Sequence, residues 1–145
     1  MKVDIRVMTL DDYEEVIRLW SATEGLSLGD DDSREGMVIY LKRNHGLCFV
    51  GVGAAKIVGT VLCGHDGRRG ILRHLAVAPE FRKNGIGKLL VRAALDALAA
   101  EGIKKCNIFV MDYNFAGISF WEHVGACRLE YDWRTLQLPT GQPLK

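Results

Sequence analysis

Gly85 and Gly87 stand where a strand-like run of the sequence gives way to its most regular helical pattern. The run at residues 71–77 is rich in branched apolar side chains, which favours a β-strand. Over residues 85–101 apolar side chains recur at helical spacing, and Gly102 follows in the position of a C-cap. A strand, a short turn and an amphipathic helix in this order predict a mixed α/β sheet whose faces are covered by helices.

The rest of the chain continues this succession of strands and helices. Alternating or Val-rich runs predict further strands, and helical spacing with capping residues predicts further helices. We expect strands at residues 3–8, 47–52, 57–63, 71–77 and 105–111, one or two more within 128–138, and helices at about 9–20, 33–43, 85–101 and 115–124. Because the sequence has no internal repeat, low-complexity tract or linker, we expect residues 1–145 to form a single domain.

Charge and composition exclude several classes of partner. The 145 residues include 19 Lys and Arg against 18 Asp and Glu, so no overall field would attract nucleic acid or an anionic membrane. No apolar run is long enough to span a bilayer, and the N-terminal residues lack the segments of a signal peptide. We therefore expect a cytoplasmic protein with no nucleic-acid or membrane partner, in which any anion-binding site is local.

The cysteines do not indicate a metal site or a disulfide framework. Cys48, Cys63, Cys106 and Cys127 are scattered, with no paired spacing and no clustered histidine. Three of them lie in apolar, strand-like runs, and buried free cysteines behave as small apolar side chains, so we expect these to pack in the core and no metal to be bound.

Two nucleotide-binding motifs also place glycines between a strand and a helix, and the sequence of this junction matches neither of them. A Walker A loop would need glycine at Arg82 and Ser or Thr at Leu89. A dinucleotide fingerprint would need a third glycine at Leu90. Neither class of nucleotide site is therefore predicted.

What remains at the junction is the N-terminus of a helix. Its unpaired N–H groups and its partial positive charge favour an anion, which glycine lets the backbone approach. Arg82, Lys83 and Lys88 add positive charge, so a pyrophosphate suits the place better than a single carboxylate. The alternative is that Gly85 and Gly87 only permit a turn and close packing.

Two sequence blocks resemble the GCN5-related N-acetyltransferase (GNAT) family. The first, HLAVAPEFRKNGIGKLL at residues 74–90, resembles the family's strand L-x-V-x-P followed by R/Q-x-x-G-x-G/A and a helix. The second, NFAGISFWEHVGA at residues 114–126, resembles N-x-x-A/G-x-x-F-Y-x-x-x-G-F. The resemblance implies an α/β (α+β) GNAT fold with a mostly antiparallel central sheet that splays at an acetyl-CoA site.

The resemblance also implies which residues hold acetyl-CoA as cosubstrate. Main-chain groups of Leu75, Ala76 and Val77 would pair with the pantetheine arm, and the Val77 N–H would polarise the thioester carbonyl. The pyrophosphate would be held by residues 82–88, and the arm would also meet the start of the following helix. In full, the residues implied in cofactor binding are Leu75, Ala76, Val77, Arg82, Lys83, Asn84, Gly85, Ile86, Gly87, Lys88, Asn114, Gly117 and Phe120.

The chain departs from the family at the position of the usual acid. Trp121 stands where the family often has a tyrosine that protonates the departing thiolate, and an indole N–H is no acid near neutral pH. Either Tyr113 or Tyr131 takes this role, or the thiolate leaves unassisted, because a thiol of pKa about 8 to 9 is a tolerable leaving group.

The sequence also offers more than one candidate for the base that deprotonates the amine. His74 lies beside the strand that would bind the cofactor, and histidine suits base catalysis. Strict alternation, however, places His74 opposite Leu75 and Val77, with Ile71 and Arg73 toward the cofactor, which favours a structural histidine. Arg73 would then orient a carboxylate on the acceptor. The remaining alternative is a base that acts through water, with Glu24, Asp112 or Glu122 at its far end.

The acidic run at residues 29–33, GDDDS, has two interpretations. It attracts a cationic amine, or it is a solvated loop in which Asp32 or Ser33 caps a helix, the more usual role of such residues.

The leading hypothesis is an N-acetyltransferase that moves the acetyl group of acetyl-CoA directly to a primary amine of a small molecule or a protein. The alternative is a CoA-binding sensor or regulatory module with weak transfer, which Trp121 motivates. A homodimer is a further expectation, because many members of the family dimerise.

Overall fold

The computed structural model describes residues 2–131 and 133–145. In these residues the strands are β1 (Asp4–Val7), β2 (Phe49–Gly53), β3 (Lys56–His65), β4 (Gly70–Val77) and β5 (Cys106–Ile108). The α-helices are α1 (Tyr13–Ser21), α2 (Arg34–Arg43), α3 (Ile86–Ala100) and α4 (Phe115–His123), and 3-10 turns occupy Leu10–Asp12, Asp30–Asp32 and Pro79–Phe81.

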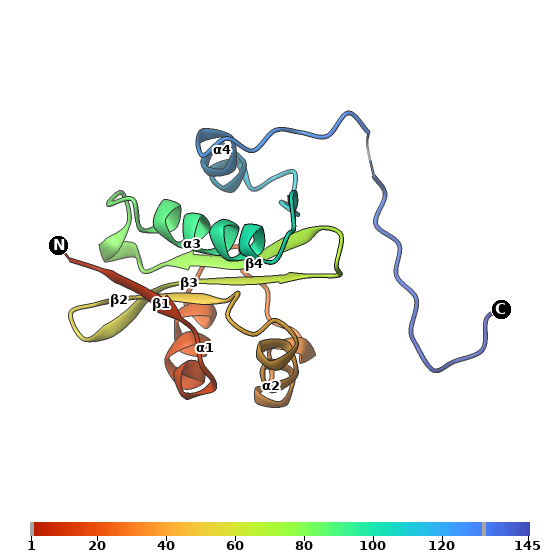
Figure 1. Cartoon of the computed structure of the whole chain (residues 1–145), viewed down its shortest axis with the longest axis horizontal. Helices are drawn as coiled ribbons and strands as arrows, with labels where there is room; N and C mark the ends of the chain where they lie inside the picture. The colour runs from red at the N-terminus through yellow and green to blue at the C-terminus, as the bar shows by residue number, and fades with distance from the viewer. Residues whose placement is uncertain (1, 132) are drawn as a thin grey trace.

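The strands form one mixed sheet in the order β1-β2-β3-β4-β5. Neighbours are antiparallel except β4 and β5, which are parallel. Helices α1 and α2 cover one face of the sheet, and α3 and α4 lie on the other (Figure 1). The predicted fold, a mixed and mostly antiparallel sheet flanked by helices, is confirmed.

Each face of the sheet has its own apolar core. Leu90 and Leu98 of α3 pack against the sheet on one side. Trp20 of α1 and Met37 of α2 pack on the opposite side. The approach of α3 depends on Gly59 of β3, where an added Cβ would lie only 3.0 Å from the Leu90 side chain.

The predicted helix starts are confirmed by their caps. The Thr9 N–H donates to Asp12 Oδ2 at 2.9 Å, and the 3-10 turn so formed leads directly into α1. The Ser33 Oγ accepts the Gly36 N–H at 3.0 Å at the start of α2. Each contact satisfies a backbone donor that a helix N-terminus would otherwise leave unpaired.

A β-bulge interrupts β4 where its middle meets β3. Thr60 pairs with Ala76 and Leu62 pairs with Arg73, so β4 carries one residue more than β3 over this interval. His74 lies inside the bulge with φ of 49°, a left-handed conformation that is uncommon for a residue other than glycine. The bulge shifts the side-chain alternation of β4, which the sequence pattern did not reveal.

Strands β4 and β5 diverge beyond a short paired stretch. Residues Gly70 to Leu72 pair with Cys106 to Ile108, and β5 then ends while β4 continues to Val77. The predicted strand at 105–111 is therefore shorter than expected, and the far half of β4 has an open edge.

The strands predicted within residues 128–138 are wrong for the described residues. Residues 128–131 and 133–138 form neither strand nor helix, and this segment runs away from the sheet (Figure 1), while residue 132 lies outside the described residues. Trp133 is 74% exposed and Leu136 is 84% exposed. Alternation stabilises a strand only where one face is buried and a neighbouring strand pairs with it, and the described residues of this segment are exposed and join no strand of the sheet.

Candidate functional site

The turn between β4 and α3 is fixed by its own backbone. Lys83 and Gly85 both adopt positive φ, 62° and 76°, and Gly85 is the N-cap residue of α3. The Asn84 side chain donates to the carbonyl oxygens of Phe81 at 3.1 Å and Arg82 at 2.9 Å. The first N–H groups of α3 have no helical acceptor, so they remain available to an anion above the turn.

Glycine is required at the two positions of this turn for different physical reasons. An added Cβ at Gly85 would meet no atom within 4 Å, so Gly85 is needed for its backbone angle and leaves open space above it. An added Cβ at Gly87 would lie 3.2 Å from the Phe120 ring, so Gly87 allows α4 to pack on α3. Gly85 therefore permits the turn and Gly87 permits the close packing, as the alternative explanation of these glycines predicted.

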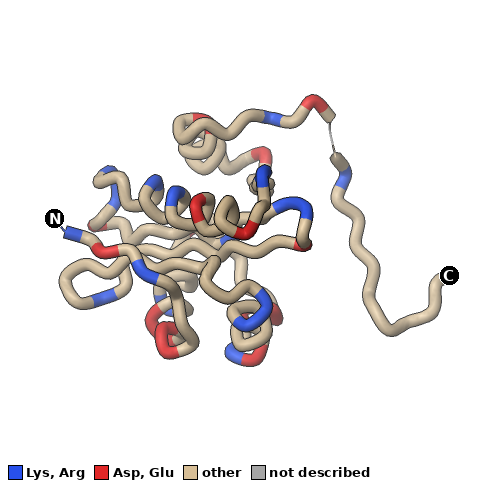
Figure 2. Tube along the Cα trace, viewed as in Figure 1, with Lys and Arg blue, Asp and Glu red and all other residues tan. Residues whose placement is uncertain are grey.

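Basic residues gather at this end of α3, as the blue segments of the trace in Figure 2 show. Arg82 Nε donates to the Val77 carbonyl at 3.0 Å, which ties the turn to the end of β4. In the described part of the chain, Lys83 and Lys88 form no ion pair and are exposed. Their charge adds to the positive end of the α3 dipole.

The open edge of β4 lies next to this turn. The Ala78 N–H donates to the Val58 carbonyl of β3 at 2.8 Å. Because successive N–H groups of a strand point to opposite edges, the Val77 N–H points to the edge that β5 has left. Leu75 and Val77 pack with the α3 core, and Ala76 packs with the core on the other face.

His74 lies on the α1 and α2 face, opposite Leu75 and Val77, as alternation predicted. The prediction that Ile71 and Arg73 point the same way as Leu75 and Val77 is wrong. Both line a cavity on the α2 side, because the bulge at His74 reverses the alternation between Arg73 and Leu75.

The His74 ring has two side-chain partners, and its backbone carbonyl has a third. Its Nε2 lies 2.7 Å from Asp32 Oδ1, and its ring packs edge-on against Trp20 with 4.7 Å between centroids. Trp20 Nε1 donates to Thr60 Oγ1 at 2.8 Å, and that hydroxyl donates to the His74 carbonyl at 2.9 Å. A carboxylate only accepts hydrogen bonds, so Nε2 carries a proton toward Asp32 and the second ring nitrogen faces elsewhere. The side chain remains 19% exposed.

The acidic run at residues 29–33 both caps helical turns and supplies the carboxylate that contacts His74. Asp32 Oδ2 accepts the Gly29 N–H at 2.9 Å, and Ser33 caps α2, which confirms the capping interpretation. The pairing of Asp32 with His74 joins residues 42 positions apart, and no local pattern in the sequence indicated it.

The second sequence block forms the start of α4. Asn114 is its N-cap residue, and Oδ1 accepts the Gly117 N–H at 3.0 Å. Phe120 and Trp121 pack edge-on, 5.1 Å between centroids, and both contact the α3 core. Trp121 therefore has a packing role.

The proposed proton donors and distant bases are not gathered at the β4 edge. Tyr113 is 73% exposed, and Tyr131 is 69% exposed on the extended C-terminal segment (Figure 1). Glu24, Asp112 and Glu122 are exposed as well. None of these five side chains has a contact that ties it to His74 or Val77 in the described residues.

Three cysteines are poor nucleophiles. Burial raises the pKa of Cys48 to about 11 and that of Cys106 to about 11. Burial, together with the neighbouring Cys106 and Cys48, raises the pKa of Cys63 to about 12. These thiols stay protonated near neutral pH, which disfavours a covalent acetyl-cysteine intermediate.

The described residues hold neither a metal-ligand cluster nor a membrane-spanning helix. Residues 2–131 and 133–145 contain no group of three or more side chains suited to a metal ion. Among the same residues no helix has the length and apolar character needed to cross a bilayer.

Comparison with known proteins gives a consistent result. The model of the acetyltransferase (GNAT) family matches residues 13–126. The chain is 36% identical over 144 residues to "Acetyltransferase SG1711" of Sodalis glossinidius (strain morsitans), covering 98% of this chain and 96% of that protein.

Solved structures share the fold at lower identity. PaiA N-acetyltransferase from Thermoplasma acidophilum, in complex with coenzyme A, superposes with a TM-score of 0.77 at 21% identity over 91% of this chain and 94% of that one. AAC(6')-Iy, in complex with a bisubstrate analogue, gives 0.78 at 18% identity over 96% of this chain and 100% of that one.

Proposed function

The chain belongs to the GNAT family of acetyltransferases, and we propose that it transfers the acetyl group of acetyl-CoA directly to a primary amine. The observation that carries the proposal is the open edge of β4 beside the N-terminus of α3. One end of this arrangement offers backbone N–H groups and cations to a pyrophosphate. The other end offers the Val77 N–H to a carbonyl.

The proposed cofactor path follows, in order, the residues that the family resemblance implies. Residues 82–88 hold the pyrophosphate, and the main chain of Leu75 to Val77 binds the pantetheine arm as an added strand would. Phe120 and the start of α4 border the arm. Asn114 and Gly117 act on this site indirectly, because the cap between them positions α4.

For the base we propose His74, with Asp32 as its positioning residue. His74 lies on the face opposite α3, three residues before Val77, which is the side from which an amine would meet a thioester carbonyl in the gap between the strands. The Asp32 contact fixes the ring and leaves the other ring nitrogen to accept a proton. The thiolate then leaves without help from a tyrosine, and the tetrahedral oxyanion is stabilised by the Val77 N–H.

The test is release of CoA thiol by the purified protein in the presence of acetyl-CoA and a panel of amines and peptides, with the acetylated product identified by mass spectrometry. We expect release that depends on the acceptor and gives an N-acetylated product. Tight acetyl-CoA binding without release on any acceptor would contradict the proposal.

That second outcome would support the sensor alternative, which one observation favours. Trp121 fills the place of the family's usual acid and packs into the core, so no side chain at that position can protonate a thiolate. A homodimer and a cytoplasmic location also stay predictions, to be tested by light scattering and by localisation of a tagged chain.

A further inference from the structure

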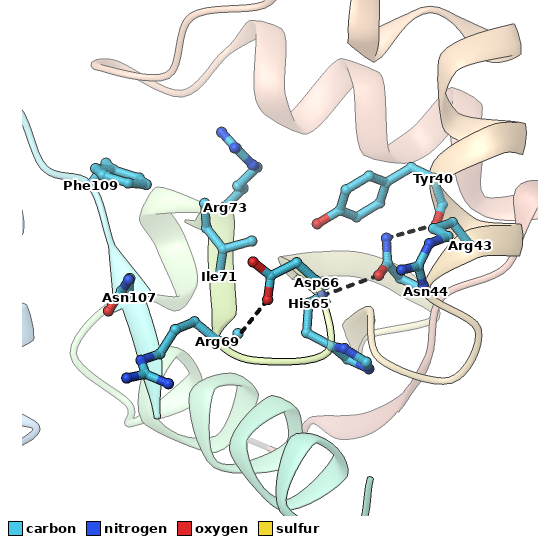
Figure 3. A pocket seen from close by; sticks show the side chains of 12 residues that line it. Tyr40, Arg43, Asn44, His65, Asp66, Arg69, Ile71, Arg73, Asn107 and Phe109 are labelled. Atoms are coloured by element: carbon cyan, nitrogen blue, oxygen red, sulfur yellow. Dashed lines mark hydrogen bonds between the residues drawn. The ribbon is translucent and has the colours of Figure 1, made fainter. Parts of the chain in front are cut away.

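A cavity of about 310 Å³ lies on the α2 face of the sheet, on the opposite side from the turn before α3 (Figure 3). Its walls come from α2, the β3–β4 turn, β4 and β5. Arg73 of β4 and Phe109 after β5 flank the place where the two strands diverge. If an amine reaches the thioester through that gap, the rest of the acceptor occupies this cavity.

The cavity is positively charged, although the chain as a whole is nearly neutral. Three arginines, Arg43, Arg69 and Arg73, line it against one carboxylate, Asp66. None of these three guanidinium groups forms an ion pair within the described residues. Arg69 Nη1 donates to the Arg68 carbonyl at 3.3 Å, and the guanidinium groups of Arg43 and Arg73 form no hydrogen bond within the described residues.

Asp66 offsets only one of the three arginine charges, and one of its oxygens is bound to backbone. Its Oδ1 accepts the N–H groups of Arg68 at 2.8 Å and Arg69 at 2.9 Å. The hydrogen bonds from the Arg69 and Arg68 backbone lower the pKa of Asp66. This carboxylate therefore stabilises the β3–β4 turn.

Tyr40 adds a neutral donor that lacks a partner. Its hydroxyl is buried, has no hydrogen-bond partner among the described residues, and is directed from α2 toward Ile71 and Arg73 (Figure 3). Burial raises the pKa of this hydroxyl, while the charge of Arg73 acts in the opposite direction, so the proton stays on and the group donates. A buried hydroxyl without a partner is costly and is satisfied when a ligand oxygen enters.

From these contacts we propose that the acceptor is a small amine that also carries an anionic group, a carboxylate or a phosphate, bound by Arg43, Arg69 and Arg73 with the Tyr40 hydroxyl. The proposal rests on the transfer reaction proposed above and names its substrate class. Guanidinium groups bind carboxylates and phosphates through paired hydrogen bonds, which a neutral or cationic amine cannot accept.

The turnover experiment compares matched pairs of acceptors. One pair is β-alanine and β-alaninamide, and the other is phosphoethanolamine and ethanolamine, so each pair differs in the anionic group. We expect kcat/KM to favour the anionic member, and the pair with the larger preference distinguishes a carboxylate from a phosphate. Equal or better use of the neutral members would overturn the inference and leave the acetyltransferase proposal intact.

Variants assign the preference to the cavity. Arg73→Gln combined with Arg43→Gln should reduce the preference for the anionic amine by roughly tenfold to a hundredfold, with acetyl-CoA affinity unchanged. Tyr40→Phe should reduce it by less, because the hydroxyl is neutral. Arg68→Gln is the control, since Arg68 lies in the same turn and does not line the cavity. An unchanged preference in the double variant contradicts the inference.

A binding measurement keeps the two proposals separate. Calorimetric titration of the CoA-bound protein with each anionic amine should show binding that the double arginine variant weakens at least about tenfold. If binding follows this pattern but no amine is acetylated, the transfer reaction fails and the anion site stands. If neither anionic amine binds more tightly than its neutral partner, the anion site is wrong whatever the turnover.

Discussion

His74 and Asp32 are the pair of side chains on which the proposed chemistry most depends. The Asp32 carboxylate fixes the His74 ring through a 2.7 Å contact and at the same time caps the turn before α2. A base must be held in one orientation to remove a proton efficiently, and this contact supplies that orientation.

His74→Gln should lower kcat by about 10² to 10⁴-fold, the usual contribution of an acid–base group, while the acetyl-CoA dissociation constant and Tm stay close to wild type. Asp32→Asn keeps an oxygen for the Gly29 N–H and should lower kcat by a smaller factor. Steady-state kinetics and calorimetry separate these effects. A Tm loss that accounts for the lower activity would assign His74 a purely structural role.

Asp12 controls stability at acidic pH. Burial by itself would raise the pKa of Asp12, but the hydrogen bonds from Arg6 and the Thr9 N–H and the charge of Arg6 outweigh it, so this pKa is lowered. A carboxyl whose pKa is lower in the folded state stabilises above its unfolded pKa and loses that contribution as the pH falls through the folded value.

Asp12→Asn should therefore cost about 1–2 kcal/mol of unfolding free energy at pH 7, with a difference from wild type that shrinks below about pH 4. Urea denaturation of both proteins from pH 7 to pH 3 measures this difference. A gap that stays constant over that range is inconsistent with a charge-dependent role.

Among the elements, the β2–β3 hairpin is strained in a way that the sequence concealed. Ala54 and Ala55 form its two-residue turn, both with positive φ, 51° and 61°. Two positive φ values match the twist of a hairpin, but alanine adopts them at a cost of roughly 1–2 kcal/mol per residue.

Replacing Ala54 with Asn and Ala55 with Gly should stabilise the protein by about 1–2 kcal/mol, because these residues favour the conformation that the turn already has. Equilibrium urea unfolding measures the gain. Acetyl-CoA affinity should not change, since neither Ala54 nor Ala55 is among the residues implied in cofactor binding. A neutral or destabilising result would show that the alanines are not strained.

Strand β4 shows why local sequence patterns predict only part of the candidate site. The residues implied to bind the cofactor follow local motifs, and the turn with Gly85 and the cap at Asn114 lie where those motifs indicated. The bulge at His74 depends on how β4 registers against β3, which is a tertiary property. Alternation alone therefore misplaced Ile71 and Arg73.

Across the complete chain, the sequence pattern predicted the layers better than the contacts between them. Apolar periodicity located the helices and the main strands, because burial of one face determines the spacing of apolar residues along the sequence. The same rule predicted strands in 128–138, where the described residues are exposed and form no strand. Tyr40 and Arg43 lie on α2, whereas Arg69 lies in the β3–β4 turn and Arg73 on β4, so no local motif joins all four.

Removal of residues 132–145 should change Tm by less than about 3 °C, because the described part of this segment is exposed and lies away from the sheet. Scanning calorimetry of the shortened and full chains tests this. A fall of several degrees would instead indicate that the segment packs on the open edge of β5 or on a second copy of the chain.

The central claim is that the turn before α3 binds the pyrophosphate of acetyl-CoA, and Gly85 tests it most directly. An added side chain at Gly85 meets open space, so Gly85→Asp and Gly85→Asn share the same backbone cost and differ in charge. Calorimetric titration with acetyl-CoA should show binding by the wild type, slightly weaker binding by Gly85→Asn, and at least about tenfold weaker binding by Gly85→Asp than by Gly85→Asn. Equal affinity of the two variants, with both folded, would contradict the claim that this turn holds the pyrophosphate.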